Sequence, residues 1–511
     1  MALPSEKLAQ SLEVLKEIQS NGSKTIKAKN LTRTHRERLL KHGFIKEVMK
    51  GWYISSRPDE VPGDSTSWYT SFWDFCSNYL NDRFGNEWCL YPEQSLLLHS
   101  GNWTIPNQLL VKATKGQNNQ TTLLYGTSIF DTRLSLPAHD SIIEIDGLKL
   151  NTLPSALISI SENFYRLHPI DSRTALSLIK DSSDILTLLL DGGHSTIAGR
   201  LAGAFRNIGN DRVANDIIKT MRAADYDVRE TDPFEEKLQH SINTREVSPY
   251  VQRIKLLWQQ MRDEIIDIFP KAPDVKNKES YLKLVEELYT TDAYHSLSIE
   301  GYQVTSELIE RVRSGSWNPD SNVEDQDQKN ALAARGYWLA FQSVKTSIEK
   351  IFDGQPPGGV ADLDHGDWYR ALFQPSVAAG IIKPSDLAGY RNSPVYIKNS
   401  KHVPLNRDAV RDCMPVLFEL LSNESEASVR AILGHFIFTF IHPYIDGNGR
   451  IGRFLMNVML ASGGYPWTII PVEKRNEYMN ALEKASINQD IQPFAHFVSQ
   501  QVKLINSSNK R

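Results

Sequence analysis

Apolar residues recur at helical spacing through the second half of the chain. They form one stripe that ends before Pro270, a second that runs to Leu297, and a third that ends before the Gly- and Pro-containing segment 353–359. Further helical patterns cover residues 410–422, 427–441, 451–461 and 473–484. This half of the chain is therefore predicted to be a helical bundle.

The first 60 residues follow a different pattern. An apolar stripe from Leu8 to Ile18 predicts an amphipathic helix, and residues 32–42 predict a second one. Residues 44–48 and 51–54 then have the pattern of two short strands. We predict a winged-helix-like module over residues 1–60.

Strand-like runs continue at residues 108–112, 121–125 and 142–145, and a helical stretch follows at 170–222. These patterns predict a small α/β domain with a helical tail over residues 61–225. The polar segment 225–248 is the expected boundary before the C-terminal half. The predicted fold class is multidomain and mainly α.

Charge changes the interpretation of the first module. Between residues 24 and 50 nine Lys or Arg stand against two Glu, a local net charge of +7, although the whole chain carries −4. A basic helix beside a basic wing suits DNA phosphates. A solvated basic face, or a surface for an acidic protein, is the alternative. The residues expected to face a DNA groove are Thr32, Arg33, His35 and Arg36.

Composition sets broader limits. A chain of 511 residues is expected to form about two to four domains, and 41% hydrophobic with 23% charged residues is typical of a soluble globular protein. Its three cysteines have no metal-ligand spacing and fit a reducing compartment. No apolar run is long enough for a membrane span, and no secretory signal is visible. A cytoplasmic location without membrane contact is expected.

The segment from His442 to Arg453 reads His-Pro-Tyr-Ile-Asp-Gly-Asn-Gly-Arg-Ile-Gly-Arg and joins two apolar helical patterns. The start of a helix binds anions, because its unpaired N–H groups and its dipole point at the ligand. Two arginines three positions apart share a helix face and can clamp phosphate oxygens. A carboxylate here can hold Mg²⁺ between phosphates, and a histidine can accept a proton from an attacking hydroxyl. The segment indicates nucleotidyl transfer, with an ordinary hydrogen-bonded loop as the alternative.

This segment resembles the signature of the Fic family, His-Pro-Phe-x-Asp/Glu-Gly-Asn-Gly-Arg-x-x-Arg, with Tyr444 in place of the phenylalanine. The resemblance implies a helical Fic domain over residues 250–505 that moves AMP from ATP to a protein hydroxyl. It implies that His442 is the general base and that Asp446 binds Mg²⁺. The nucleotide-binding residues that it implies are Gly447, Asn448, Gly449, Arg450 and Arg453.

A second segment, Ser296-Leu-Ser-Ile-Glu300-Gly301, resembles the inhibitory pattern of the same family, Ser/Thr-x-x-x-Glu-Gly/Asn. A carboxylate beside Arg453 would occupy the guanidinium that should receive the γ-phosphate. ATP would then bind with its α-phosphate turned away from in-line attack. In related proteins the same glutamate can position a water that hydrolyses an AMP–protein bond, so AMP removal is an alternative activity.

Two further segments fit the resemblance. Val395, Tyr396 and Ile397 alternate in a way that predicts a short hairpin similar to the Fic flap, where a target segment pairs by β-augmentation. An ordinary surface hairpin is the alternative. Tyr478, near the start of a C-terminal helix, is expected either to line the adenine pocket or to be a core residue.

Together these features predict a Fic-type protein adenylyltransferase that uses ATP and Mg²⁺. Its expected target is a Ser, Thr or Tyr hydroxyl of a protein, which includes the chain itself, and Glu300 is expected to inhibit it. The order of the N-terminal elements resembles the AbiEi-type antitoxins, which implies a DNA-binding regulatory half. The alternatives are AMP removal, transfer of phosphocholine or UMP, and a nucleotide-sensing transcriptional regulator without transferase activity. The oligomeric state stays open, with a homodimer as one expectation.

Overall fold

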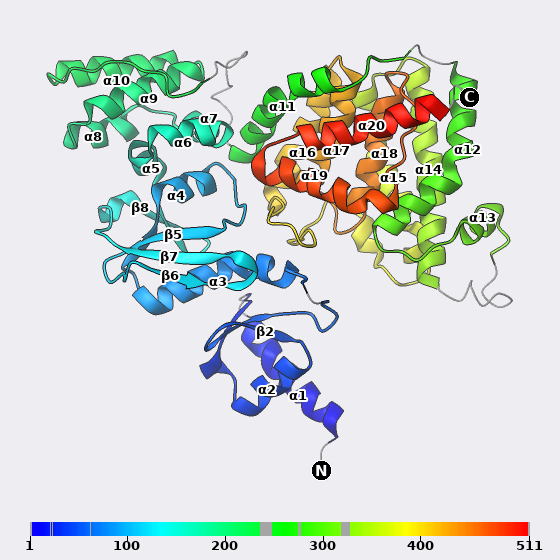
Figure 1. Cartoon of the computed structure of the whole chain (residues 1–511), viewed down its shortest axis with the longest axis horizontal. Coiled ribbons are helices and arrows are strands. Elements are labelled where there is room, and N and C mark those ends of the chain that lie inside the picture. Colours follow the sequence, from blue (N-terminus) through cyan, green and yellow to red (C-terminus); the bar gives the residue numbers. More distant parts are fainter. Residues whose placement is uncertain are drawn as a thin grey trace. The chain divides into compact units, whose positions relative to one another are not determined.

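The computed structural model describes residues 3–20, 22, 24–61, 63–235, 248–273, 277–317 and 328–508 (Figure 1). Helices dominate, and three small sheets occur in the described part of the chain. Two compact units share the chain: Met1–Arg253 with Tyr396–Val403, called unit 1, and Ile254–Val395 with Pro404–Arg511, called unit 2. The predicted multidomain, mainly α class is confirmed. Much of the expected polar boundary, residues 236–247, lies outside the described residues.

Unit 1 begins with a small module that alternates helices and strands. Its three strands form an antiparallel sheet in which β3 lies between β1 and β2. Gly51 makes the turn of the β2–β3 wing with a φ of 85°, which glycine adopts without a steric cost. Leu15, Leu39 and Ile45 form part of the buried core, so both predicted helices and both predicted wing strands are confirmed. The elements are α1 (Pro4–Gln19), β1 (Thr25–Lys27), α2 (Arg33–Lys41), β2 (Ile45–Met49) and β3 (Trp52–Ser55).

A four-stranded mixed sheet follows in the order β4-β5-β7-β6, in which only β5 and β7 are parallel among these described strands. A separate hairpin is formed by β8 and β9. The elements are α3 (Thr66–Phe84), β4 (Trp88–Leu90), α4 (Pro92–His99), β5 (Gln108–Ala113), β6 (Asn119–Thr122), β7 (Ser128–Arg133), β8 (Ile142–Ile145) and β9 (Leu148–Asn151).

Two features of this region differ from the sequence-based expectation. The run at 121–125 was predicted as a strand, but β6 ends at Thr122 and Tyr125 adopts a left-handed φ of 50° that interrupts the strand. Helix α3 was not predicted. Its buried residues, which include Trp68, Phe72 and Cys76, nevertheless recur at helical spacing, so the pattern that marks this helix was present in the sequence.

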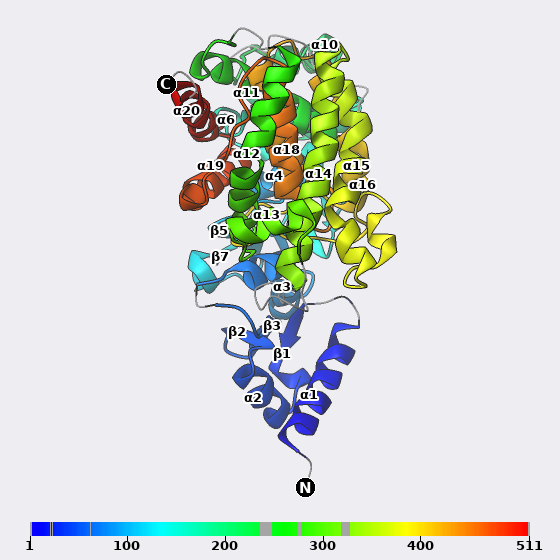
Figure 2. The ribbon, with the colours of Figure 1, turned by 90° about the vertical axis from the view of Figure 1, so that its right-hand side faces the viewer.

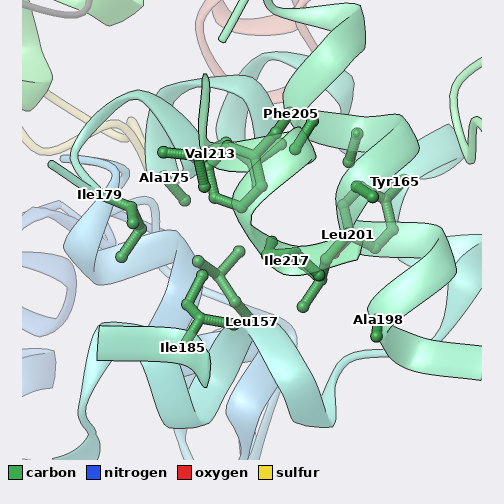
Figure 3. Packing of buried hydrophobic residues seen from close by; sticks show 14 of the residues in the cluster. Leu157, Tyr165, Ala175, Ile179, Ile185, Ala198, Leu201, Phe205, Val213 and Ile217 are labelled. Carbon is green, nitrogen blue, oxygen red and sulfur yellow. The ribbon is translucent and has the colours of Figure 1, made fainter. Parts of the chain in front are cut away.

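The rest of unit 1 is helical. Its helices bury their apolar faces in one cluster, which contains Leu157, Leu201, Phe205, Val213 and Ile217 (Figure 3). This region includes the helical tail that the sequence predicts, because amphipathic helices of this kind must bury their apolar stripes against one another. The helices are α5 (Leu153–Ser159), α6 (Glu162–Leu167), α7 (Pro169–Ser177), α8 (Ser183–Asp191), α9 (Ser195–Asn207) and α10 (Asp211–Ala223).

Unit 2 is built around two helices, α17 and α18, whose residues are almost all buried. A helix that is apolar on every side must be covered on every side, and α14 and α15 run beside α18 (Figure 2). The helical patterns predicted at 410–422, 427–441, 451–461 and 473–484 are confirmed. The helices are α12 (Lys278–Ile299), α13 (Ser306–Ser314), α14 (Gln328–Phe352), α15 (Pro357–Ala378), α16 (Arg407–Asn423), α17 (Ala427–Ile441), α18 (Asn448–Ala461), α19 (Arg475–Asn488) and α20 (Gln492–Ser508).

Helix α11 (Pro249–Ile268) contains the boundary between the units, since Arg253 belongs to unit 1 and Ile254 to unit 2. No helix in the described part of the chain combines the length and the hydrophobicity that crossing a membrane requires. The three cysteines, Cys76, Cys89 and Cys413, are buried and carry free thiols.

Helices α14 and α15 approach each other closely at Gly336. A Cβ atom at this position would lie 1.9 Å from the backbone oxygen of Leu372. The next residue, Phe373, lies against Gly447 at the start of α18, because a Cβ on that glycine would lie 2.8 Å from its ring. The α14–α15 contact therefore supports the wall of the loop that joins α17 to α18.

The substitution Gly336→Ala is expected to destabilise the protein, because the new methyl group meets backbone atoms that cannot rotate away. Overpacking of this kind costs about 1–3 kcal/mol, so the midpoint of thermal unfolding, followed by circular dichroism, should fall. Gly359→Ala in α15 is the matched control. No atom lies within 4 Å of its added Cβ, and alanine favours a helix by up to about 1 kcal/mol. A Gly336→Ala protein as stable as this control would contradict the close contact.

Candidate active site

His442 ends α17 with a left-handed backbone, at φ 55° and ψ 60°. This conformation is uncommon for residues other than glycine and turns the chain out of the helix. The ring atom Nδ1 lies 3.1 Å from the backbone oxygen of Thr439. Because a carbonyl oxygen can only accept, Nδ1 carries the proton and Nε2 keeps a lone pair. The ring is therefore oriented with its free acceptor away from the helix.

Burial is the main influence on the His442 ring, and it lowers the pKa to about 4 even though the hydrogen bond to Thr439 acts in the opposite direction. The imidazole is therefore neutral, and able to accept a proton, at pH 7. The charge of Arg391 also lowers this pKa, whereas those of Glu300 and Asp446 raise it.

The loop between α17 and α18 is held by Asn448. Its Oδ1 accepts a hydrogen bond from the Tyr444 amide at 2.9 Å, and its Nδ2 donates to the Tyr444 carbonyl at 2.8 Å. Gly447, at φ 83°, donates its N–H to Asp446 Oδ1 at 2.6 Å. Helix α18 begins at Asn448, and the N–H groups of a first helical turn have no carbonyl partner inside the helix. The loop thus presents backbone donors that suit an anion.

Arg450 adds a buried positive charge to this helix start. Only 2% of its side chain is exposed, and its guanidinium donates to Asp446 Oδ2 at 3.1 Å. Its Nε has no hydrogen-bond partner among the described residues. The rings of Tyr302 and Phe373 lie 5.3 and 5.1 Å from the guanidinium carbon. A buried guanidinium with an unused donor is suited to a phosphate oxygen.

Tyr302 and Phe373 were not identified from the sequence. Each lies far from the motif along the chain and outside any recognisable pattern. Tyr302 follows the end of α12, which is hydrogen-bonded to Arg453 of α18, and Phe373 belongs to α15, which packs beside α18. Aromatic faces of this kind attract cations.

Asp446 is the one residue of the motif that offers an exposed carboxylate, with 62% of its side chain accessible. The described residues contain no cluster of three or more His, Cys, Asp or Glu side chains that could hold a metal by themselves. Mg²⁺ commonly binds through one or two carboxylates together with substrate phosphates and water. Asp446 beside a phosphate-binding helix start therefore fits Mg²⁺ carried by a nucleotide.

Arg453 is bonded to the end of α12. Its guanidinium donates to Glu300 Oε1 at 2.7 Å, to Ser296 Oγ at 2.9 Å and to the Ser296 carbonyl at 3.0 Å. Glu300 Oε1 also lies against Gly449, where a Cβ atom would be only 2.4 Å away. Gly301 follows at φ 90° and ends the helix. The Glu300 carboxylate therefore occupies the space in front of the α18 start.

Two neighbouring arginines favour the ionised form of the Glu300 carboxylate. Burial raises its pKa, but the charges of Arg453 and Arg450 outweigh burial, and the net pKa lies below the ordinary value. The carboxylate is therefore ionised at neutral pH. Its hydrogen bond with Arg453 joins two charged groups and is therefore stronger than a hydrogen bond between neutral groups.

Tyr478 is buried, and its hydroxyl lies 2.7 Å from His435 Nε2. The rings of Phe494 and Phe497 are its neighbours. These contacts are those of a core tyrosine. Its role in binding adenine stays a prediction.

The hairpin predicted around Tyr396 is wrong. Val395, Tyr396 and Ile397 lie in a loop, and no strand occurs in the described residues 389–404. Pro394 and Pro404 flank this stretch and have no N–H to donate to a strand ladder. The chain turns instead at Asn399, whose φ is 58°.

Within unit 1, the segment Tyr396–Val403 is held by the loops around α3 and β5. Asn399 Oδ1 accepts from the Ser65 amide at 3.0 Å, and the Lys401 carbonyl accepts from the Ile105 amide at 3.1 Å. Tyr396 lies under the ammonium group of Lys24, which is 4.1 Å from its ring centre. The segment is therefore held by these contacts and not by pairing within a hairpin. A role for the segment in docking a target stays a prediction.

The residues predicted to face DNA do not all point to solvent. His35 is half-buried, and its Nδ1 lies 2.9 Å from Ser11 Oγ of α1, so its role in contacting DNA stays a prediction. Thr32 caps α2, with its Oγ1 accepting from the His35 amide at 3.3 Å. Arg33 is 84% exposed and paired with Glu37 at 2.7 Å. A role in contacting DNA stays a prediction for Arg33 and for the half-buried Arg36.

Residues 366–460 match the model of the Fic/DOC family. The matched range contains the complete His442–Arg453 segment, helix α17 and all of α18 except its last residue, Ala461. The C-terminal region carries a Fic domain.

Curated relatives agree with this assignment. Over 218 residues, 42% of the chain, the sequence is 29% identical to protein adenylyltransferase Fic of Drosophila yakuba and 28% identical to that of Drosophila willistoni. The chain spans 40% of the length of these relatives. Fic-1 from C. elegans is similar at 19% identity, with 67% of this chain and 97% of that chain covered and a TM-score of 0.37. A Fic domain containing signaling protein from Bacteroides thetaiotaomicron is similar at 17% identity, with coverages of 48% and 93% and a TM-score of 0.33.

The substitution Asn448→Ala is expected to weaken both the fold and the binding of ATP. It leaves the buried Tyr444 amide and carbonyl without partners, at a cost of about 1–3 kcal/mol each. The thermal midpoint should fall, and the affinity for ATP, measured by calorimetry with Mg²⁺, should fall with it.

A matched control is Asn457→Ala in the same helix. Asn457 makes the same pair of bonds to the backbone of Thr468, at 3.0 and 2.7 Å, but at the opposite end of α18. This variant should lose comparable stability and keep its ATP affinity. Equal loss of ATP affinity in both variants would contradict a role for the Tyr444–Asn448 loop in anion binding.

Proposed function

We propose that the protein transfers AMP from ATP to a Ser, Thr or Tyr hydroxyl of a protein. One observation carries this proposal: His442, whose Nδ1 is bonded to Thr439 so that Nε2 keeps its lone pair, ends α17 directly before the loop that leads to the donor-rich start of α18. A base and a phosphate site in one place are what nucleotidyl transfer to a hydroxyl requires. The name of the curated relatives, protein adenylyltransferase, supports ATP as the substrate.

In the proposed reaction the acceptor oxygen attacks the α-phosphorus of ATP. Its proton passes to His442 Nε2, the bond from the α-phosphorus to the bridging oxygen breaks, and pyrophosphate leaves. The N–H groups at the start of α18 and the Arg450 guanidinium stabilise the charge that develops on the phosphate oxygens. Mg²⁺ held by Asp446 and the phosphates would supply further charge neutralisation.

We also propose that Glu300 inhibits this reaction. Its carboxylate takes the Arg453 guanidinium and lies against Gly449, so a γ-phosphate would have to displace it. ATP that binds without this displacement would not present its α-phosphorus for in-line attack. Removal of the carboxylate would free Arg453 for the nucleotide.

The substitution Glu300→Gly is expected to raise AMP incorporation by about 10- to 100-fold, because a hydrogen bond to a charged group contributes about 1.5–3 kcal/mol. Incorporation is measured with α-labelled ATP and Mg²⁺, and mass spectrometry identifies the modified hydroxyl on the chain itself. The double variant Glu300→Gly, His442→Ala is the control and should show no label. Full labelling of the double variant would show that His442 is not the base.

The wild type and the Glu300→Gly variant also distinguish AMP transfer from AMP removal. A pre-modified target incubated with Mg²⁺ and without ATP should keep its AMP if the protein is a transferase only. Release of AMP by the wild type, lost in Glu300→Gly, would favour removal of AMP as the main activity. In that case Glu300 would position a water instead of only blocking Arg453.

A second candidate function is DNA binding by the first module of unit 1. The local net charge of +7, and an 84% exposed Arg33 at the start of α2 beside a β-wing, favour it. This function also agrees with the resemblance to AbiEi-type antitoxins. It is independent of the transfer reaction.

The paired substitution Arg33→Ala, Arg36→Ala is expected to weaken binding to duplex DNA selected from a random pool. Each lost phosphate contact lowers the slope of log affinity against log salt by about 1, so fluorescence anisotropy is measured at several salt concentrations. Arg57→Ala, which removes a 75% exposed arginine outside α2, is the control. Unchanged affinity and slope in the paired variant would exclude α2 as the contact. DNA binding without AMP incorporation in Glu300→Gly would favour a pure regulator.

A further inference from the structure

Arg391 lies in the loop between α15 and α16 and is buried, with only 2% of its surface exposed. No carboxylate of the described residues lies within ion-pair distance of its guanidinium. A buried charge is normally paired, because its transfer from water costs several kcal/mol. Interactions other than an ion pair must therefore compensate for the cost of burying this guanidinium.

Its donors are all directed at backbone carbonyl groups. Nε donates to the His442 oxygen at 2.7 Å, and one terminal nitrogen reaches the Ile441 oxygen at 3.4 Å. The Arg391 amide donates to the Pro443 oxygen at 2.9 Å. The remaining side-chain bonds go to Leu405 at 2.5 Å and to Ser393 at 3.1 Å. Arg391 therefore binds three consecutive residues, 441–443, where α17 ends.

This position is one where carbonyl groups need a donor. The last carbonyls of a helix have no partner inside it and carry the negative end of the dipole. His442 also adopts a left-handed backbone there, which costs a residue other than glycine about 1–3 kcal/mol unless its surroundings hold it. The Arg391 bond to the His442 oxygen fixes the peptide whose rotation would turn the ring.

We propose that Arg391 is a positioning residue for the transfer reaction, because its guanidinium holds the His442 backbone so that Nε2 faces the acceptor hydroxyl. This inference rests on the proposed function. A guanidinium is required, since its rigid fork reaches carbonyls on both sides of the loop at once, whereas a lysine ammonium is a single point of donation.

The test compares Arg391→Lys with Arg430→Lys, both in the Glu300→Gly protein. Arg430 is also buried and donates to backbone carbonyls, those of Glu424 and Ser425 at 2.6 and 3.0 Å, but at the opposite end of α17. A structural role alone would make the two variants behave alike. Arg391→Gln is measured in parallel, so that the result does not depend on the folding of one variant.

Arg391→Lys is expected to lower kcat about 100-fold, the loss that a 1 Å misplacement of a reacting group causes. KM for ATP and the calorimetric affinity for ATP should change by less than about twofold, because the α18 phosphate site is intact. Arg430→Lys should lose as much thermal stability as Arg391→Lys and keep its kcat. Unchanged kcat in Arg391→Lys, or an equal fall in both variants, would overturn the inference.

A second measurement does not depend on transfer activity. Nitrogen-15 NMR of the His442 ring, assigned with His442→Ala, reports which ring nitrogen carries the proton. The wild type should show only the Nδ1–H form, and Arg391→Lys should show a mixture of both forms. If Glu300→Gly incorporates no AMP, the proposed function fails while this spectrum still tests Arg391. An unchanged spectrum in Arg391→Lys would refute the positioning role.

Discussion

The junction between α17 and α18 imposes the constraint on which the rest of the site depends. Two nearly fully buried helices meet at a sharp turn, so the carbonyls that end one and the amides that begin the other must find partners without water. Arg391 donates hydrogen bonds to the carbonyls at the end of α17, and Asn448 binds the backbone of the turn. The first turn of α18 has backbone N–H groups with no partner inside the helix, and we propose that these donors bind phosphate.

The same constraint accounts for the position of Glu300. A helix start with two buried arginines favours an anion, and Glu300 at the end of α12 supplies a carboxylate. This carboxylate is ionised and bonded to Arg453. Under the proposed function, inhibition and nucleotide binding would use the same groups, and the balance between them would depend on a few hydrogen bonds to charged groups.

The structure differs from the sequence-based interpretation mainly where remote residues supply the contacts. The alternation around Tyr396 predicts a strand, yet pairing also needs a partner strand and free N–H groups, and the flanking Pro394 and Pro404 have none. The segment instead contacts residues near α3 and β5. His35 was expected to face a DNA groove, and its ring also contacts Ser11 of α1. Helix α3 was not predicted, although its apolar residues recur at helical spacing.

The sequence by itself determined the local parts. It specified most helices of unit 2 through their apolar spacing, although α13, α15 and α20 were not predicted. It also specified the turn and donors of the His442–Arg453 segment, and the acidic residue at position 300 with a glycine to end its helix. Only the tertiary structure decided which remote groups meet these parts. Glu300 reaches Arg453, Tyr302 and Phe373 flank Arg450, and Arg391 binds the end of α17. Local spacing is encoded by backbone periodicity, whereas contacts between distant segments depend on how whole helices pack.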